Sequence, residues 1–201
     1  MPVPVDLPGL DQFIEEVPDG RILVLEGSMD PASSHLALHL ATRAARAGRA
    51  VTFVSTRTGE PAQRPEIVGG GPLQVAEQVP WMELNDHAGT GDVVVDSFSF
   101  SALDVADHEL ASGLGSLRKR LRQTGNVAVL TLERGMLDAR AAAIVYHLAD
   151  GIIQFHARED AEGSVQYLRV PKWMGGRTHI RNIYFEFDGS NLLIDTRRRV
   201  G

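Results

Sequence analysis

The segment from residue 21 to residue 55 constrains the fold of this chain most strongly, because it has the pattern of one strand, turn, helix and strand. Residues 22–26 form an apolar run that ends at a glycine. Residues 31–47 are apolar nearly all round, which is typical of a buried helix. A β-branched run at residues 50–55 predicts a second strand. A right-handed crossover then sets two parallel strands in one sheet, so we predict an α/β fold.

The turn before the helix stands where a phosphate-binding loop would carry the pattern GxxxxGK[ST]. Such a loop directs backbone amides and a lysine at phosphate oxygens. Gly27 and Ser34 keep the two ends of the pattern, but Ser33 stands in place of the lysine and Ala32 in place of the second glycine. Asp30 adds a carboxylate, whose repulsion of phosphate at contact distance is worth about 1–4 kcal/mol. We therefore interpret the loop as degenerate.

Asp30 also has a structural interpretation, as the N-cap of a helix that begins at Pro31. An aspartate at the N-cap accepts hydrogen bonds from the free amides of the first turn, and proline is well suited to the first helical position. On this interpretation the protein's own carboxylate fills the space that a phosphate would use. The turn is then ordered without a ligand.

Length and composition indicate a single domain over residues 1–201, with a lead-in at residues 1–20 and edge strands and a tail at residues 150–201. The chain is 43% apolar and 23% charged, as globular proteins are. Its net charge of −6 creates no overall positive field that would attract nucleic acid or an anionic membrane. There is no cysteine and no apolar run of membrane-spanning length, so we expect a soluble, cytoplasmic protein.

Periodicity predicts the remaining elements. Residues 10–17 and 73–79 each suggest a short helix, and residues 92–97 are an apolar run ending in an acid, typical of a central parallel strand. A leucine repeat predicts a helix at residues 105–123, whose exposed basic face we interpret as solvated in preference to a nucleic-acid patch. That face carries Arg118, Lys119, Arg120 and Arg122. Last come a strand at 126–132, a helix at 138–148 capped by Asp138, and antiparallel edge strands at 152–156, 165–170, 183–187 and 192–195.

Several motifs together resemble the KaiC-like branch of the RecA superfamily, in their order and spacing more than singly. They are Leu7-Pro8-Gly9-Leu10-Asp11, Pro18-Asp19-Gly20, the strand that ends at Asp96, Ala149-Asp150-Gly151, and Lys172 followed by His179. The resemblance spans residues 7–194. It implies a RecA-like three-layer fold, with a mostly parallel central sheet flanked by helices and antiparallel strands added at the C-terminal edge.

The resemblance also implies roles for single residues. Asp96 matches the aspartate that holds the magnesium shell, and Ser34 matches the magnesium-binding hydroxyl. The structural alternative is a helix-start serine and a strand-end aspartate that support the edge of the sheet. Water-activating glutamates of such ATPases are replaced here by Thr56 and Arg57. The family's K-x-R-G stretch, which reaches a neighbouring subunit's nucleotide, has lost its arginine to Met174.

We expect a subunit interface at Lys172, Trp173, Met174 and His179, where an exposed Trp173 would be the anchor. The alternative is that Trp173 packs against its own edge strand. His35 and His39 are spaced for a shared metal, but no third ligand has a telling spacing, so we expect plain packing.

The leading hypothesis is a catalytically inactive KaiC/RecA-like protein that regulates or assembles through protein contacts, with itself or with an active relative. No cofactor is expected under it. The alternatives are an ATPase that binds ATP and magnesium through an unusual loop, and a DNA-binding protein of the recombination-mediator kind. We expect nucleic-acid binding to be weak or absent and no membrane contact.

Overall fold

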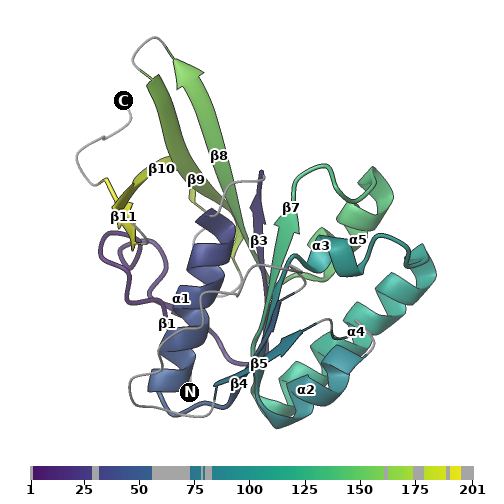
Figure 1. The fold of residues 1–201 in the computed structure, drawn as a ribbon. Helices are drawn as coiled ribbons and strands as arrows, with labels where there is room; N and C mark the ends of the chain where they lie inside the picture. Colours follow the sequence, from purple (N-terminus) through teal and green to yellow (C-terminus); the bar gives the residue numbers. More distant parts are fainter. Residues whose placement is uncertain are drawn as a thin grey trace.

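The computed structural model describes residues 2–28, 32–55, 73–77, 79, 83–160, 163–173, 179–188 and 191–195. In these residues one large sheet forms the centre of the molecule (Figure 1). Its strands are β3 (Ile22–Gly27), β4 (Val51–Ser55), β5 (Leu73–Glu77), β6 (Asp92–Asp96), β7 (Ala128–Glu133), β8 (Gly151–Asp160), β9 (Gly163–Trp173), β10 (His179–Asp188) and β11 (Asn191–Ile194).

The strand order is β11-β10-β9-β8-β3-β7-β6-β4-β5 among the described residues. The strands from β8 to β5 in this order run parallel to one another. The last three strands of the chain are antiparallel, β9 to β8, β10 to β9 and β11 to β10. The predicted fold class, a mostly parallel sheet with antiparallel strands at one edge, is therefore confirmed. The prediction was wrong at β8, which we expected to be antiparallel. β8 is parallel to β3, because the helix before it returns the chain to the edge where β3 begins.

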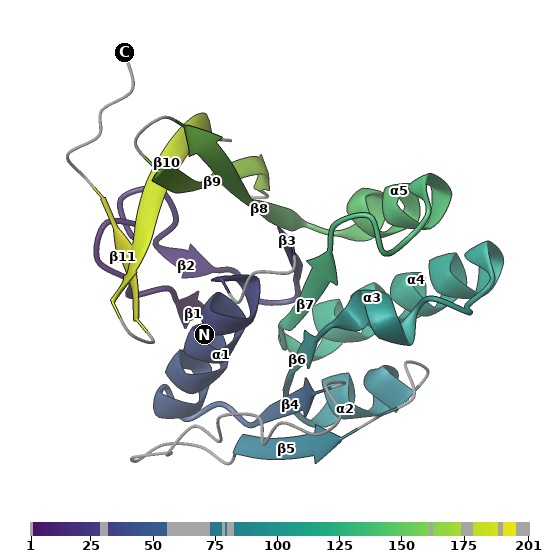
Figure 2. The same ribbon diagram turned by 45° about the horizontal axis from the view of Figure 1, so that its top comes forward.

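Helices cover both faces of the sheet. They are α1 (Ala32–Arg46), α2 (Leu84–Thr90), α3 (Phe98–Ser101), α4 (Asp107–Thr124) and α5 (Ala139–Leu148). α1 lies on one face, and α2, α4 and α5 lie on the other (Figure 2). None of the helices in the described part of the chain is long and apolar enough to cross a membrane.

The local sequence accounts for the ends of these helices. The four leucines of the repeat in α4 are all buried, and the helix ends where Gly125 adopts a left-handed conformation with φ of 76°. Gly125 is suited to that conformation because it has no Cβ atom. α5 begins at Asp138, whose Oδ1 accepts hydrogen bonds from the amides of Arg140 and Ala141. Both of these predictions are confirmed.

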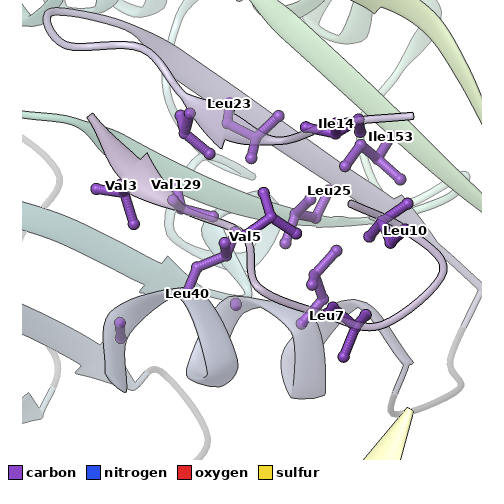
Figure 3. Close-up of a cluster of buried hydrophobic side chains, with 14 of the residues drawn as sticks. Val3, Val5, Leu7, Leu10, Ile14, Leu23, Leu25, Leu40, Val129 and Ile153 are labelled. Carbon is purple, nitrogen blue, oxygen red and sulfur yellow. The ribbon is translucent and has the colours of Figure 1, made fainter. Parts of the chain in front are cut away.

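The lead-in does not form the predicted helix at residues 10–17. It contains turns and two short strands, β1 (Val3–Pro4) and β2 (Glu16–Val17), which pair with each other. The predicted apolar side chains are nevertheless directed inward, and Leu10 and Ile14 are buried. Figure 3 shows them beside sheet residues such as Leu25. The conformation of this segment is therefore determined by packing of its apolar side chains between α1 and the sheet. That packing does not require a continuous helix.

The second helix prediction that fails is the one at residues 73–79. Residues 73–77 form β5, which pairs in parallel with β4 along its whole length. The apolar residues of this stretch fit either element, because so short a run has no decisive periodicity. Pairing with β5 satisfies the backbone hydrogen-bonding groups on the open edge of β4, which a helix at residues 73–79 would leave unpaired.

Candidate functional site

The carboxyl ends of three central strands meet at one edge of the sheet, where open α/β sheets bind their ligands. β3 ends at Gly27, β6 at Asp96 and β7 at Glu133. α1 begins beside them at Ala32. The structure thus brings Gly27, Ser33, Ser34 and Asp96 to one place, as predicted from their positions at strand and helix ends. Asp30 and Thr56-Arg57 lie outside the described residues.

Ser33, which stands in place of the phosphate-loop lysine, is buried against the end of β3. Only 6% of its surface is exposed. A Cβ atom built on Gly27 would lie 3.2 Å from the Ser33 Oγ and 3.6 Å from its Cβ. Gly27 is therefore needed for close packing of α1 on β3. A serine in this position lacks both the reach and the charge that a lysine uses to hold outer phosphates.

Ser34 and Asp96 are in direct contact. The Ser34 Oγ donates a hydrogen bond to Asp96 Oδ1 at 2.7 Å, and the Thr131 Oγ1 donates to the same oxygen at 3.0 Å. Asp96 and Thr131 are both buried. The sequence prediction missed Thr131, although a hydroxyl inside the apolar run of β7 is a visible signal. The pair fits a magnesium shell and equally fits the structural alternative, in which the hydroxyls hold the carboxylate in place.

A second carboxylate at this edge, Glu133, accepts hydrogen bonds from the hydroxyls of Ser97 and Ser99. The Ser97 amide donates to Thr131 Oγ1 at 2.6 Å, and the Glu133 amide donates to Ser99 Oγ at 3.1 Å. Ser97 has a positive φ of 63°, which is uncommon for a residue with a side chain. Its amide and hydroxyl bonds hold this conformation. These contacts join the turn after β6 to the end of β7.

Glu26 supplies the third carboxylate, next to the loop. It is 5% exposed, and it accepts hydrogen bonds from the Tyr146 hydroxyl at 2.5 Å and from Gln154 Nε2 at 2.7 Å. Burial raises the pKa of Tyr146 above its ordinary value, and the hydrogen bond to Glu26 raises it further, so the hydroxyl stays protonated and donates. Nothing in the sequence pattern signalled this cluster, because its members come from β3, α5 and β8.

Arg134 follows β7, and its Nε lies 3.7 Å from Glu26 Oε1. Its guanidinium is directed along β8, where one terminal nitrogen donates to the Phe155 carbonyl oxygen at 3.0 Å. The other terminal nitrogen lies 3.2 Å from His156 Nδ1. Arg134 is therefore engaged with β8 and Glu26.

In the described part of the chain, negative charge gathers at this edge. Glu26, Asp96 and Glu133 place three carboxylates at the strand ends, and the phosphates would add negative charge beside them. The hydrogen-bonding groups of these carboxylates are already used by side chains of the protein.

The expected interface segment is used largely within the chain. Lys172 Nζ donates to the carbonyl oxygens of Tyr146 and His147, at 2.9 and 3.2 Å, at the end of α5. Burial lowers the pKa of Lys172 from its ordinary value, Asp150 raises it and Arg118 lowers it. The lysine therefore stabilises the end of α5, where the helix dipole favours a cation.

Trp173 is only partly exposed, so the expectation of an exposed anchor is wrong. Its ring packs over Gly151, where a Cβ atom would lie 3.1 Å from Trp173 Cε3. The alternative that this side chain packs against its own sheet is the one observed. Met174 lies outside the described residues. His179 begins β10, and its side chain is not among those described.

The basic face of α4 is exposed as expected at three of its four cations, Lys119, Arg120 and Arg122. Arg118 is the exception, with only 26% of its side chain accessible. Its guanidinium donates to Asp150 Oδ1 at 2.9 Å. The pairing joins α4 to the start of β8, which periodicity within one helix does not reveal.

His39 has a packing role, as expected. Its Nε2 lies 2.7 Å from the Val5 carbonyl oxygen, which ties the lead-in to α1. Burial lowers the pKa of His39, so the neutral imidazole is favoured and can donate to that carbonyl. Among the described residues no group of three or more metal-binding side chains is present.

The chain is similar to one protein family and to solved structures of known fold. The family described as "Family of unknown function (DUF7125)" matches residues 17–201. No curated protein matches the sequence. The fold is similar to that of the flagellar accessory protein FlaH from Methanocaldococcus jannaschii, with a TM-score of 0.77, 15% identity, and coverage of 97% of this chain and 99% of that chain. It is also similar to the KaiC-like protein PH0186 from Pyrococcus horikoshii OT3, with a TM-score of 0.75, 20% identity, and coverage of 97% and 99%. These likenesses show that the chain has the fold of FlaH and of KaiC-like proteins.

Proposed function

The chain belongs to the Family of unknown function (DUF7125), and we propose that it is a catalytically inactive KaiC/RecA-like protein that regulates or assembles through protein contacts. Its proposed partners are a second copy of itself or a related active KaiC/RecA-like protein. No cofactor is required for this role. Under this proposal the fold is retained as a scaffold, and the edge that binds nucleotide in phosphate-loop proteins has become part of the hydrogen-bonded structure.

The observation that carries the proposal is the position of Ser33. It is buried against Gly27 where a phosphate-binding lysine would stand, so the principal positive group of the loop is missing. The neighbouring carboxylates Asp96 and Glu133 strengthen the argument. Both are held by hydroxyl groups of the protein, which supports a structural role for them.

Exposed apolar side chains near the same edge support a role in protein contacts. Phe100 of α3 is 59% exposed, Leu103 is 46% exposed, and Met136, after β7, is 36% exposed. Glu133 connects the segments that carry them, because its side chain accepts from Ser99 and its carbonyl oxygen accepts from the Met136 amide at 3.1 Å. Large exposed apolar side chains that gather at one edge are typical of protein-binding surfaces.

One observation favours the second candidate, a protein that still binds ATP with magnesium. The Ser34–Asp96 pair retains the two groups that the resemblance assigns to the magnesium shell. We place this candidate second because the pair supplies neither the positive charge nor the amide-rich loop that phosphates require. Nucleic-acid binding is expected to be weak, since the net charge is −6 and Arg118 is paired with Asp150.

Calorimetric titration of the whole chain with magnesium and ATP separates the two candidates. We expect no binding by the unmodified protein, and none by Ser33→Lys, because one lysine does not remove the carboxylates around it. That variant also keeps Asp30, whose carboxylate is expected to repel the phosphates. Micromolar binding by the unmodified protein would overturn the inactive assignment and favour the ATP-binding candidate.

The contact role is tested by light scattering of the purified chain, alone and mixed with an active relative. Association is expected to weaken in Met136→Asp and in Phe100→Asp. Leu193→Asp is the matched control, because Leu193 is 51% exposed but lies on β11, at the far end of the sheet. A chain that stays monomeric and binds no relative would remove the basis for this role, and so would equal effects of all three substitutions.

A further inference from the structure

The amino edge of the sheet, opposite the loop, holds a group of cations around one buried carboxylate. Asp150 lies between α5 and β8 and is 1% exposed. Its Oδ2 accepts a hydrogen bond from the Ile22 amide at 3.1 Å, and its Oδ1 accepts from Arg118 at 2.9 Å. Two further guanidinium groups approach the same Oδ1, Arg21 at 3.7 Å and Arg122 at 3.8 Å. Three arginines from two separate parts of the chain therefore converge on a single oxygen atom.

Positive charge is in excess around Asp150. Lys172 adds a fourth cation close to Asp150, although its Nζ is bound to the two carbonyl oxygens at the end of α5. One carboxylate cannot neutralise four cations, and guanidinium groups this close repel one another. A second anion would remove the imbalance.

The hydrogen bonds of the arginines are also incomplete. The Nε atoms of Arg21 and Arg118 are buried and have no hydrogen-bond partner among the described residues. A buried donor without an acceptor is unfavourable and rare in native proteins. The three side chains are partly open to solvent, since 32% of the Arg21 side chain, 26% of Arg118 and 51% of Arg122 are accessible. Several guanidinium forks that face one point are the arrangement that recognises tetrahedral oxyanions.

A small hollow adjoins the cations. Its walls include the apolar side chains of Val17, Pro18 and Trp173, and Arg21 and Asp150 also line it. The hollow is thus built by the lead-in, β3 and β9, and the arginines of α4 face Asp150 at its border. An anion bound by the arginines would be shielded on this side from water.

We propose that Arg21, Arg118 and Arg122 form a binding site for a phosphate group at the amino edge of the sheet. The ligand is a small molecule that carries phosphate or diphosphate. The site is separate from the loop edge, and it does not depend on whether the protein is an active ATPase. Diphosphate is expected to bind more tightly than phosphate, because its additional oxygens can accept from more than one guanidinium fork.

Titration of the full chain with inorganic phosphate and with pyrophosphate, at constant ionic strength, tests this site. We expect pyrophosphate binding to weaken at least about tenfold in Arg122→Gln, since a charge-assisted contact is lost. Lys119→Gln removes the same charge from the same helix at an exposed position, and it should leave the affinity within about twofold. Asp96→Asn, at the opposite edge, should also leave it unchanged.

Nuclear magnetic resonance gives a second readout that a loss of folding cannot mimic. In the unmodified protein the Nε–H signals of Arg21 and Arg118 should shift on addition of pyrophosphate, because the anion binds the terminal nitrogens of the same guanidinium groups. The proposal is overturned if pyrophosphate at about 10 mM moves neither signal, or if Lys119→Gln weakens binding as much as Arg122→Gln does. Loss of binding in Asp96→Asn alone would place the anion at the loop edge and would also overturn it. A single-stranded oligonucleotide that binds where pyrophosphate does not would point to nucleic acid and exclude a small ligand.

Discussion

Replacing Asp96 by alanine separates a structural carboxylate from a nucleotide-binding one. In the structure this carboxylate accepts hydrogen bonds from Ser34 at 2.7 Å and from Thr131 at 3.0 Å, and the aspartate is only 6% exposed. If its role is structural, its removal leaves two hydroxyl donors without their acceptor and weakens the connection between α1, β6 and β7.

The expected loss follows from these two contacts. A hydrogen bond to a charged group is worth about 1.5–3 kcal/mol, and relief from burying the carboxylate offsets part of the sum. We expect Asp96→Ala to lower the free energy of unfolding by about 2–3 kcal/mol. For a chain of this length the melting temperature should fall by about 4–12 °C.

Urea denaturation and thermal melting, each with and without magnesium and ATP, are the measurements. Asp104→Ala is the control, because Asp104 is an exposed acid in the turn after α3. It should change the unfolding free energy by less than about 0.5 kcal/mol. Magnesium and ATP should stabilise neither the unmodified protein nor either variant.

Two results would refute the reasoning. If Asp96→Ala is as stable as Asp104→Ala, the hydroxyl contacts do not hold this edge together. If the unmodified protein is stabilised by nucleotide, by about 2.7 kcal/mol at a hundredfold excess over the dissociation constant, and Asp96→Ala is not, then the carboxylate serves nucleotide binding.

Two further predictions concern stability. Burial lowers the pKa of His39 below its ordinary value of 6.5, so below about pH 6.5 the unfolded chain takes up a proton that the folded chain does not, and stability falls. His39→Gln should therefore show a smaller decline in melting temperature from about pH 8 to about pH 5.5 than the unmodified protein. The control is His108→Gln, which changes an exposed histidine and should decline as much as the unmodified protein does. Equal declines in the two variants would contradict the prediction. Gly151→Ala should cost about 1–2 kcal/mol in urea denaturation, because its Cβ would lie 3.1 Å from the Trp173 ring, whereas Gly115→Ala in α4 meets open space and should be neutral or stabilising. A stable Gly151→Ala would show that the ring moves freely.

The sequence alone predicted the elements whose burial pattern is long and regular. The unit at residues 21–55, the leucine repeat of α4 and the Asp138 cap of α5 appear where they were expected, because each depends on contacts within a few residues. The short stretches at residues 10–17 and 73–79 were assigned wrongly. Which element these residues form depends on the strand that they pair with, and that strand lies elsewhere in the chain.

The candidate site divides in the same way. Motif spacing was sufficient to bring Ser34 and Asp96 together at the ends of α1 and β6. The side chains that complete the edge came from strands whose neighbours the sequence does not specify, and Thr131 and Glu133 are examples. Thr131 and Glu133 lie beside the ends of β3 and β6 because β7 pairs between these two strands.

The sequence by itself showed that Ser33 stands in place of the phosphate-loop lysine, so the positive charge of that lysine is absent from this position. Only the tertiary structure decided what Trp173 and Arg118 do. Trp173 packs over Gly151, and Arg118 pairs with Asp150 between α4 and β8. Neither side chain has the solvent-facing position that we expected from the neighbouring sequence. The physical reason is that a side chain's surroundings depend on strand order and helix packing, which join residues far apart in the chain.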